Sequence, residues 1–87
     1  MDVFVDSHAL LHGLTEKHIV YAWENFIAKQ HRHAPDVDTI VLVGSDMDGR
    51  MIQMVAVEKP IGVLIFHAMS PPTKKVLKEL GLIRSKQ

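Results

Sequence analysis

His67 is the residue of this sequence best placed for acid–base chemistry. It closes an apolar run, Val63-Leu64-Ile65-Phe66-His67, shortly before the Pro71-Pro72 pair with which a helix is expected to start. An imidazole changes charge near neutral pH and can act as a general acid or base, and a helix start attracts anions. The alternative is structural, with His67 hydrogen-bonding the backbone at this corner between strand and helix.

Cationic and polar side chains that could bind an anion lie at two places, after the Asp48-Gly49 pair and at the expected helix start that follows His67. Arg50 directly follows Asp48-Gly49 at the start of a strand, where it is a candidate phosphate clamp or a charge that merely flanks the hairpin. Further candidates for binding RNA or another anion stand at the expected helix start after His67. They are Ser70, Lys74 and Lys75.

The remaining histidines raise the question of a metal. His8 and His12 are four residues apart, which puts them on one face of a helix. A His-x-x-x-His pair with no glutamate inside it and no evident third ligand is also what two surface histidines look like. A histidine-dependent metal binder remains an alternative, but we expect no metal and no other cofactor.

Composition narrows the classes of protein that fit. The 87 residues correspond to one domain, residues 1–87, and the absence of cysteine excludes disulfides and thiolate chemistry. Ten Lys and Arg balance ten Asp and Glu, so no overall basic surface draws the chain to nucleic acid. No apolar run is long enough to span a membrane and the N-terminus is acidic, so we expect a cytoplasmic protein.

The hydrophobic pattern predicts an α+β fold with two N-terminal helices, an antiparallel sheet of three to four strands and a C-terminal helix. Thr15 is the expected N-cap of the second helix, whose inward stripe comprises Ile19, Trp23, Phe26 and Ile27. Ser70 is the expected N-cap of the C-terminal helix, which ends at Gly81. The expected helices cover residues 7–12, 15–25 and 71–80, and the expected strands cover residues 39–43, 50–58 and 61–68, with a further possible strand at 26–33.

The expected strands are apolar on both faces. In residues 50–58 both alternating sets of side chains are mostly hydrophobic, which is typical of strands covered on two sides. Either the C-terminal helix covers the second face, or an apolar surface remains for a partner protein or a second copy of the chain.

Four motifs in order give the chain a resemblance to a known family. They are Ser7-His8-Ala9-Leu10-Leu11-His12-Gly13-Leu14-Thr15-Glu16, Ile40-Val41-Leu42-Val43-Gly44, Asp48-Gly49-Arg50-Met51-Ile52-Gln53-Met54-Val55 and Ile65-Phe66-His67-Ala68-Met69. This series resembles the BrnT-type toxins of the RelE-like group, found in bacterial type II toxin–antitoxin systems. The resemblance implies a RelE/BrnT-like fold and a metal-independent ribonuclease (an mRNA interferase) that is neutralised by a protein antitoxin, expected to be of the ribbon-helix-helix type.

Carried over position by position, the resemblance assigns His67, Arg50 and His12 as the catalytic residues. The chain departs from the family at Leu11, where the family has lysine, and at Met69, where it has arginine. Cations stabilise the charge that develops during RNA cleavage, and these two departures each remove a cation. Two interpretations therefore stay open: a toxin-like endoribonuclease, or a non-catalytic protein-interaction domain of the same fold.

Overall fold

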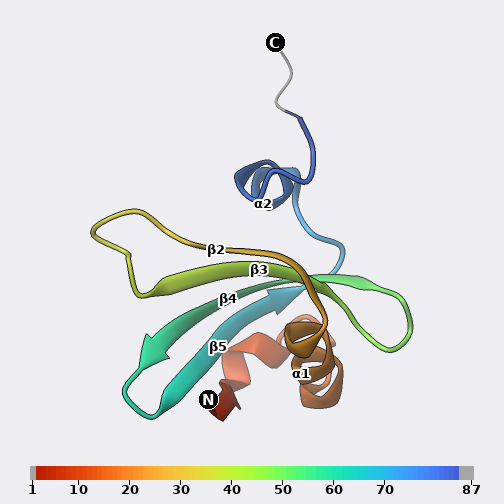
Figure 1. Cartoon of the computed structure of the whole chain (residues 1–87). Coiled ribbons are helices and arrows are strands. Elements are labelled where there is room, and N and C mark those ends of the chain that lie inside the picture. The colour runs from red at the N-terminus through yellow and green to blue at the C-terminus, as the bar shows by residue number, and fades with distance from the viewer. Residues whose placement is uncertain (1, 85–87) are drawn as a thin grey trace.

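One mixed sheet of five strands organises residues 2–84, the part of the chain described by this computed structural model (Figure 1). The strands are β1 (Asp2–Val5), β2 (Phe26–His31), β3 (Thr39–Ser45), β4 (Met51–Lys59) and β5 (Gly62–Met69). Their order across the sheet is β1-β5-β4-β3-β2. Neighbouring strands from β2 to β5 are antiparallel, whereas β1 runs parallel to β5. The first strand of the chain therefore lies beside the last one.

The helical elements of residues 2–84 are short. They are the 3-10 turn η1 (Ser7–Leu10) and the α-helices α1 (Glu16–Glu24) and α2 (Lys74–Glu79). Thr15 caps α1, as the sequence predicted, because its hydroxyl oxygen accepts the backbone N–H of His18. None of the helices within this described part is long and apolar enough to cross a membrane.

The expected arrangement of two N-terminal helices, an antiparallel sheet and a C-terminal helix is wrong. The first expected helix is only the four-residue turn η1, and the N-terminal segment forms strand β1 instead. β1 takes its hydrogen bonds from β5, about sixty positions later in the chain, with Val3 opposite Val63. A four-residue segment carries too little local pattern to reveal so distant a partner. The sheet is therefore mixed, and the RelE/BrnT-like architecture expected from the resemblance does not describe it.

The inward stripe of α1 is shorter than predicted. Ile19 is fully buried and Trp23 packs against the core. Phe26 and Ile27 lie in β2 and are about half exposed, because the helix ends at Glu24 and the chain turns directly into the strand. Aromatic and β-branched residues favour strands over helices, so the prediction extended the helical period beyond the helix.

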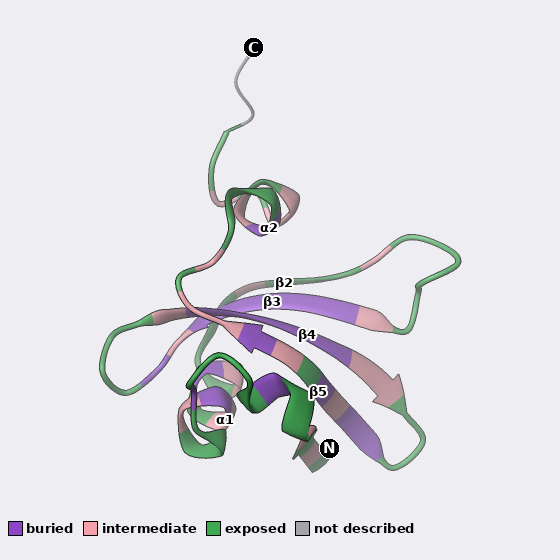
Figure 2. Ribbon diagram, turned by 180° about the vertical axis from the view of Figure 1, so that it is seen from behind, coloured by how far each residue is buried: buried purple, intermediate pink, exposed green. Residues whose placement is uncertain are grey.

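The larger core lies between the sheet and the layer formed by η1 and α1 (Figure 2). Gly44 of β3 lets α1 approach closely, because a Cβ at this position would lie 1.9 Å from the backbone oxygen of Ala22. The fully or almost fully buried side chains of this core are Ala9, Leu14, Ile19, Ala22, Leu42, Ile52, Met54, Ala56, Val63, Ile65 and Ala68. It is almost entirely aliphatic.

Helix α2 begins later than predicted. Thr73 is its N-cap, with a side-chain oxygen that accepts the N–H of Val76, and Ser70 is not the cap. Ser70 and Pro71 each precede a proline, and a residue in that position is disfavoured in the helical conformation. Ser70 instead donates its hydroxyl to the backbone oxygen of Met51, 2.6 Å away. This bond ties the end of β5 to the start of β4.

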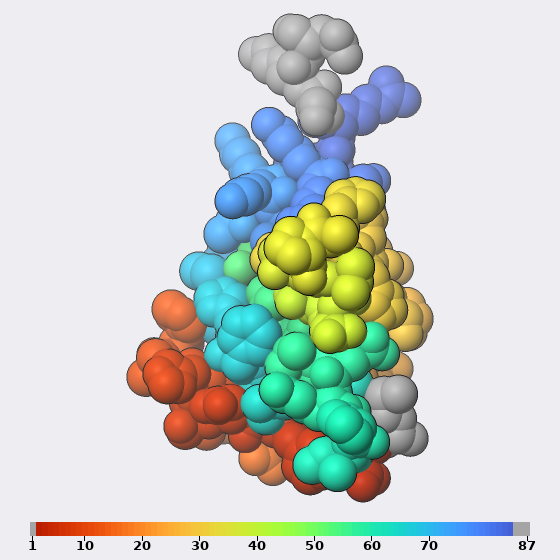
Figure 3. Space-filling model, turned by 90° about the vertical axis from the view of Figure 1, so that its left-hand side faces the viewer, coloured from red at the N-terminus to blue at the C-terminus, as the bar shows by residue number. Residues whose placement is uncertain are grey.

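The second face of the sheet is only partly covered. α2 packs with Val76 on Val41 and Val43 of β3. On the same face the side chains of β1 and β5 stay open, with Phe4 and Phe66 about 40% exposed. Figure 3 shows strand atoms, green to cyan, at the surface between α2 and the N-terminal segment. The C-terminal helix is thus too short to cover this face alone.

Candidate functional site

His12 and His67 form a pair at the open end of strand β5. β1 pairs with β5 only as far as Ile65, so the rest of β5 has no strand beside it on that edge. η1 packs against β5, and the segment that follows η1 brings His12 close to His67. The two ring centroids lie 5.7 Å apart and the ring planes are at 75°. His12 is exposed and His67 is half-buried. Two of the three predicted catalytic residues are therefore neighbours.

Gln53 of β4 holds the second ring of this pair. Its amide nitrogen lies 3.2 Å from Nε2 of His67, and its amide oxygen accepts both the backbone N–H of Thr73, at 2.8 Å, and the Thr73 hydroxyl, at 3.1 Å. The Gln53 side chain is almost completely buried, with only 4% of the residue exposed. A buried amide costs free energy unless it is hydrogen-bonded. Here it connects a histidine to the cap of helix α2.

The surroundings of His67 favour its neutral form. Burial lowers the pKa of His67, and the positive charge of nearby His12 lowers it further. His67 is therefore uncharged at neutral pH while His12 faces solvent. The two rings stand in different environments, which is the arrangement that separates the roles of paired titratable groups.

Of the three residues predicted to bind an anion, Lys74 and Lys75 follow Thr73 on α2, whereas Ser70 has no free side chain. Lys74 and Lys75 are exposed at the start of α2, directly after Thr73. Ser70 has its hydroxyl committed to Met51. The lysines can thus provide positive charge on the helix that also holds Gln53.

Arg50 stands at the turn between β3 and β4, directly before Met51, the first residue of β4. Its Nε donates to Oδ2 of Asp46 at 2.8 Å. Arg50 therefore shares no hydrogen bond with His67, and the single anion-binding pocket expected from these two residues does not form between the described side chains.

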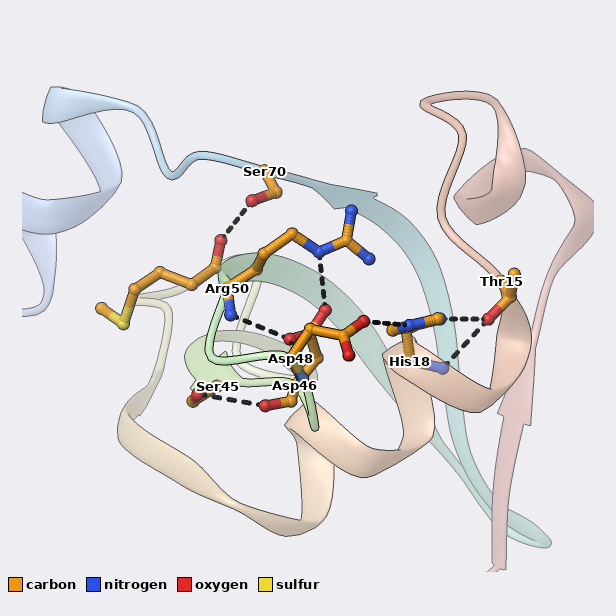
Figure 4. Close-up of polar contacts among 8 residues, drawn as sticks. Thr15, His18, Ser45, Asp46, Asp48, Arg50 and Ser70 are labelled. Atoms are coloured by element: carbon orange, nitrogen blue, oxygen red, sulfur yellow. Dashed lines mark hydrogen bonds and ion pairs between the residues drawn. The ribbon is translucent and has the colours of Figure 1, made fainter.

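Asp46 organises the turn between β3 and β4 (Figure 4). Its side chain is fully buried, and Oδ1 accepts the backbone N–H groups of Asp48, at 2.9 Å, and Arg50, at 2.8 Å. Burial by itself raises the pKa of Asp46, but the hydrogen bonds from Arg50 and Asp48 and the charge of Arg50 outweigh it and lower the pKa. The carboxylate is thus the ionised centre of this turn.

His18 of α1 joins the same turn. Its Nε2 lies 2.9 Å from Oδ2 of Asp48, and its Nδ1 is hydrogen-bonded to the hydroxyl of Thr15 (Figure 4). Candidate ligand atoms of His18, Asp46 and Asp48 lie within 4.8 Å of one another. Both oxygens of Asp46 already accept N–H groups, which leaves too few free donors for a metal. We interpret the group as a hydrogen-bonded link between α1 and the hairpin.

Sequence reasoning missed Gln53, Asp46 and His18. Gln53 carries a signal, because it is a single polar residue inside an otherwise apolar strand. Asp46 carries a second signal. It begins the turn that contains Asp48-Gly49, and aspartate often accepts backbone N–H groups from residues two positions later.

Comparisons of the chain with protein families, with curated proteins and with solved structures find no match.

Proposed function

We propose that this chain is a toxin-type ribonuclease that cleaves RNA without a metal ion. The observation that carries the proposal is the pair of imidazoles, with centroids 5.7 Å apart, at an open strand end. Lys74 and Lys75 on the adjoining helix would attract the phosphate backbone, in place of the basic surface that the neutral chain lacks.

The reaction needs groups that this pair can provide. The 2′-hydroxyl of one nucleotide attacks the adjacent phosphorus, its proton goes to a base, and the bond to the 5′ oxygen breaks as that oxygen gains a proton. The products are a 2′,3′-cyclic phosphate and a 5′-hydroxyl. Histidine is the side chain most often used for such proton transfers, and hydrogen-bond donors stabilise the charge on phosphorus.

The biological setting follows from the sequence resemblance. His12-Gly13, Gly49-Arg50 and His67-Ala68 are the positions that carry it. On this proposal the chain acts on mRNA in the bacterial cytoplasm and is neutralised by an antitoxin of the ribbon-helix-helix type. The proposal rests on these residues and not on a RelE-like architecture, which the mixed sheet does not have.

Cleavage of a fluorescent RNA oligonucleotide by the purified chain in excess EDTA tests the proposal. We expect cleavage with a cyclic phosphate product, reduced about 10²- to 10⁴-fold by His12→Ala, the usual effect of losing a proton-transfer group. His33→Ala is the control, because His33 is an exposed histidine in the loop after β2. A wild-type chain that leaves the RNA intact at high enzyme concentration would overturn the proposal.

A second candidate function is protein binding through the part of the sheet, on β1 and β5, that α2 leaves uncovered. Ile61 is 72% exposed, and a hollow of about 430 Å³ beside it is lined by Phe4, Pro60 and Leu64. Exposed apolar surface of this kind is typical of interfaces. Light scattering at high protein concentration tests self-association, with Ile61→Asp expected to reduce it. A chain that stays monomeric and binds no hydrophobic dye would count against this function.

A further inference from the structure

The orientation of the Gln53 amide determines which nitrogen of His67 carries a proton. The backbone N–H of Thr73 can only donate, so the atom of Gln53 that it meets at 2.8 Å must be the amide oxygen. The amide nitrogen, a donor, therefore faces Nε2 of His67 at 3.2 Å. Nε2 must accept this hydrogen bond and cannot carry a hydrogen. In the neutral ring the proton then sits on Nδ1.

The other ring nitrogen is open to solvent. Nδ1 of His67 has no hydrogen-bond partner among residues 2–84, and these residues contain no buried side-chain nitrogen that lacks one. Nδ1 therefore reaches the surface. His67 presents an N–H donor there, while its lone pair points inward to Gln53.

We propose that Gln53 is a positioning residue that holds His67 as a neutral Nδ1–H donor for a phosphate oxygen of the substrate. This inference rests on the proposed function and divides the roles within the pair. His12, which is exposed, accepts the proton of the 2′-hydroxyl. The 2′ oxygen–phosphorus bond forms as the bond to the 5′ oxygen breaks, the leaving oxygen takes a proton from water, and His12 returns its proton to the hydroxide left behind.

Protonation of His67 would disrupt this arrangement. A doubly protonated ring would place a second N–H against the amide N–H of Gln53, and it would be repelled by His12 whenever His12 holds a proton. On the β4 side the group that hydrogen-bonds to the ring is the uncharged amide of Gln53. The hydroxyl and N–H of Thr73 hold the amide in turn, so the N-cap residue of α2 determines the hydrogen-bonding character of His67.

Imidazole ¹⁵N NMR of the full chain tests the positioning role without any substrate. For wild type we expect His67 to show a protonated Nδ1 and an unprotonated Nε2. Gln53→Glu replaces the donor with an acceptor of the same shape, so we expect the proton to move to Nε2 and the pKa of His67 to rise. Gln30→Glu, on the exposed strand β2, makes the same change away from the site and should leave the His67 signals in place.

Substitution of His67 tests its role in the reaction. Asparagine places an N–H close to the position of Nδ1, so His67→Asn should cleave RNA at least about tenfold faster than His67→Ala, since one lost donor in an active site costs about 10²- to 10³-fold. Equal loss in both variants would overturn the donor role in favour of a proton-transfer role. An Nε2–H tautomer in wild type would overturn the role of Gln53 whatever the activity. If the tautomer is as expected and RNA stays intact, the ribonuclease proposal fails and the positioning role of Gln53 stands.

Discussion

Arg32 and Glu79 join the end of β2 to the end of α2 through two contacts. Nε of Arg32 lies 3.1 Å from Oε2 of Glu79, and Nη2 lies 3.4 Å from Oε1. Both side chains are partly buried, so solvent screens the pair less than a fully exposed one. α2 has six residues and a small apolar contact, so this pair is a substantial part of its attachment.

Loss of this ion pair should loosen α2. We expect Arg32→Ala to lower the free energy of unfolding by about 0.2–1 kcal/mol, the range for pairs that keep contact with solvent. Urea unfolding followed by circular dichroism measures it. A double-mutant cycle with Glu79→Ala isolates the interaction, and a coupling energy of zero would contradict the attachment.

The close approach of α1 to β3 makes Gly44 intolerant of a side chain. A Cβ there would collide with backbone atoms of Ala22, which cannot move as a side chain does. We expect Gly44→Ala to lower the free energy of unfolding by about 3 kcal/mol or more. Gly49→Ala is the comparison, because it has a positive φ of 81° but open space around it. Its expected cost is about 1–2 kcal/mol, and equal effects would argue against the collision.

The buried carboxylate of Asp46 should make stability depend on acid pH. Its pKa is lower in the folded chain than its ordinary value of 3.8, so its contribution is complete above that value and is lost as the pH falls through the folded pKa. Asp46→Asn leaves an amide N–H facing the guanidinium of Arg50, so we expect it to lower the urea midpoint at neutral pH. The difference in urea midpoint between this variant and wild type should shrink at acid pH. Asp36→Asn, in an exposed loop, should have the same midpoint as wild type at neutral pH and at acid pH.

His67 should add a second pH dependence near neutrality. Its folded pKa lies below the ordinary 6.5, so the unfolded chain binds the proton more readily and stability falls as the pH drops from 6.5 toward the folded pKa. We expect His67→Asn to flatten the pH dependence of the urea midpoint in this window. His33→Asn should retain the slope. An unchanged slope in the His67 variant would contradict the lowered pKa.

The lysines of α2 should determine how RNA binding responds to salt. Removing one phosphate contact to single-stranded RNA lowers the slope of log affinity against log salt by about 0.7. We therefore expect Lys74→Ala with Lys75→Ala to weaken binding and flatten the salt dependence, measured by fluorescence anisotropy. Lys17→Ala, on the exposed side of α1, is the control. Identical slopes for all variants would place the RNA elsewhere.

Local features of this fold were predictable and distant ones were not. The Thr15 cap and the Asp48-Gly49 hairpin depend on residues within four positions of each other, and both are confirmed. The strand β1 depends on Ile65 and its neighbours far along the chain, so no local pattern could indicate it. The expected cap at Ser70 was wrong because two prolines keep the following backbone extended before Thr73.

The candidate site shows the same division. His12 and His67 could be chosen by type and by position next to helix boundaries, but their proximity depends on how η1 crosses β5. Arg50 looked equally suitable by type. It lies apart from His67 because its guanidinium is bound to Asp46 in the turn before β4, a contact that residue type alone does not reveal.

The parallel pairing of β1 with β5 has a consequence for how the protein forms. β2, β3, β4 and β5 can associate with near neighbours as they leave the ribosome, but β1 has no strand to join until residue 65 has been synthesised. Contacts between such distant segments form slowly because a long loop must close first. Until then the apolar side chains of β1 that pack against the core, Val3 and Val5, stay uncovered, so newly made molecules are vulnerable to aggregation and to chaperone capture while the sheet is being translated.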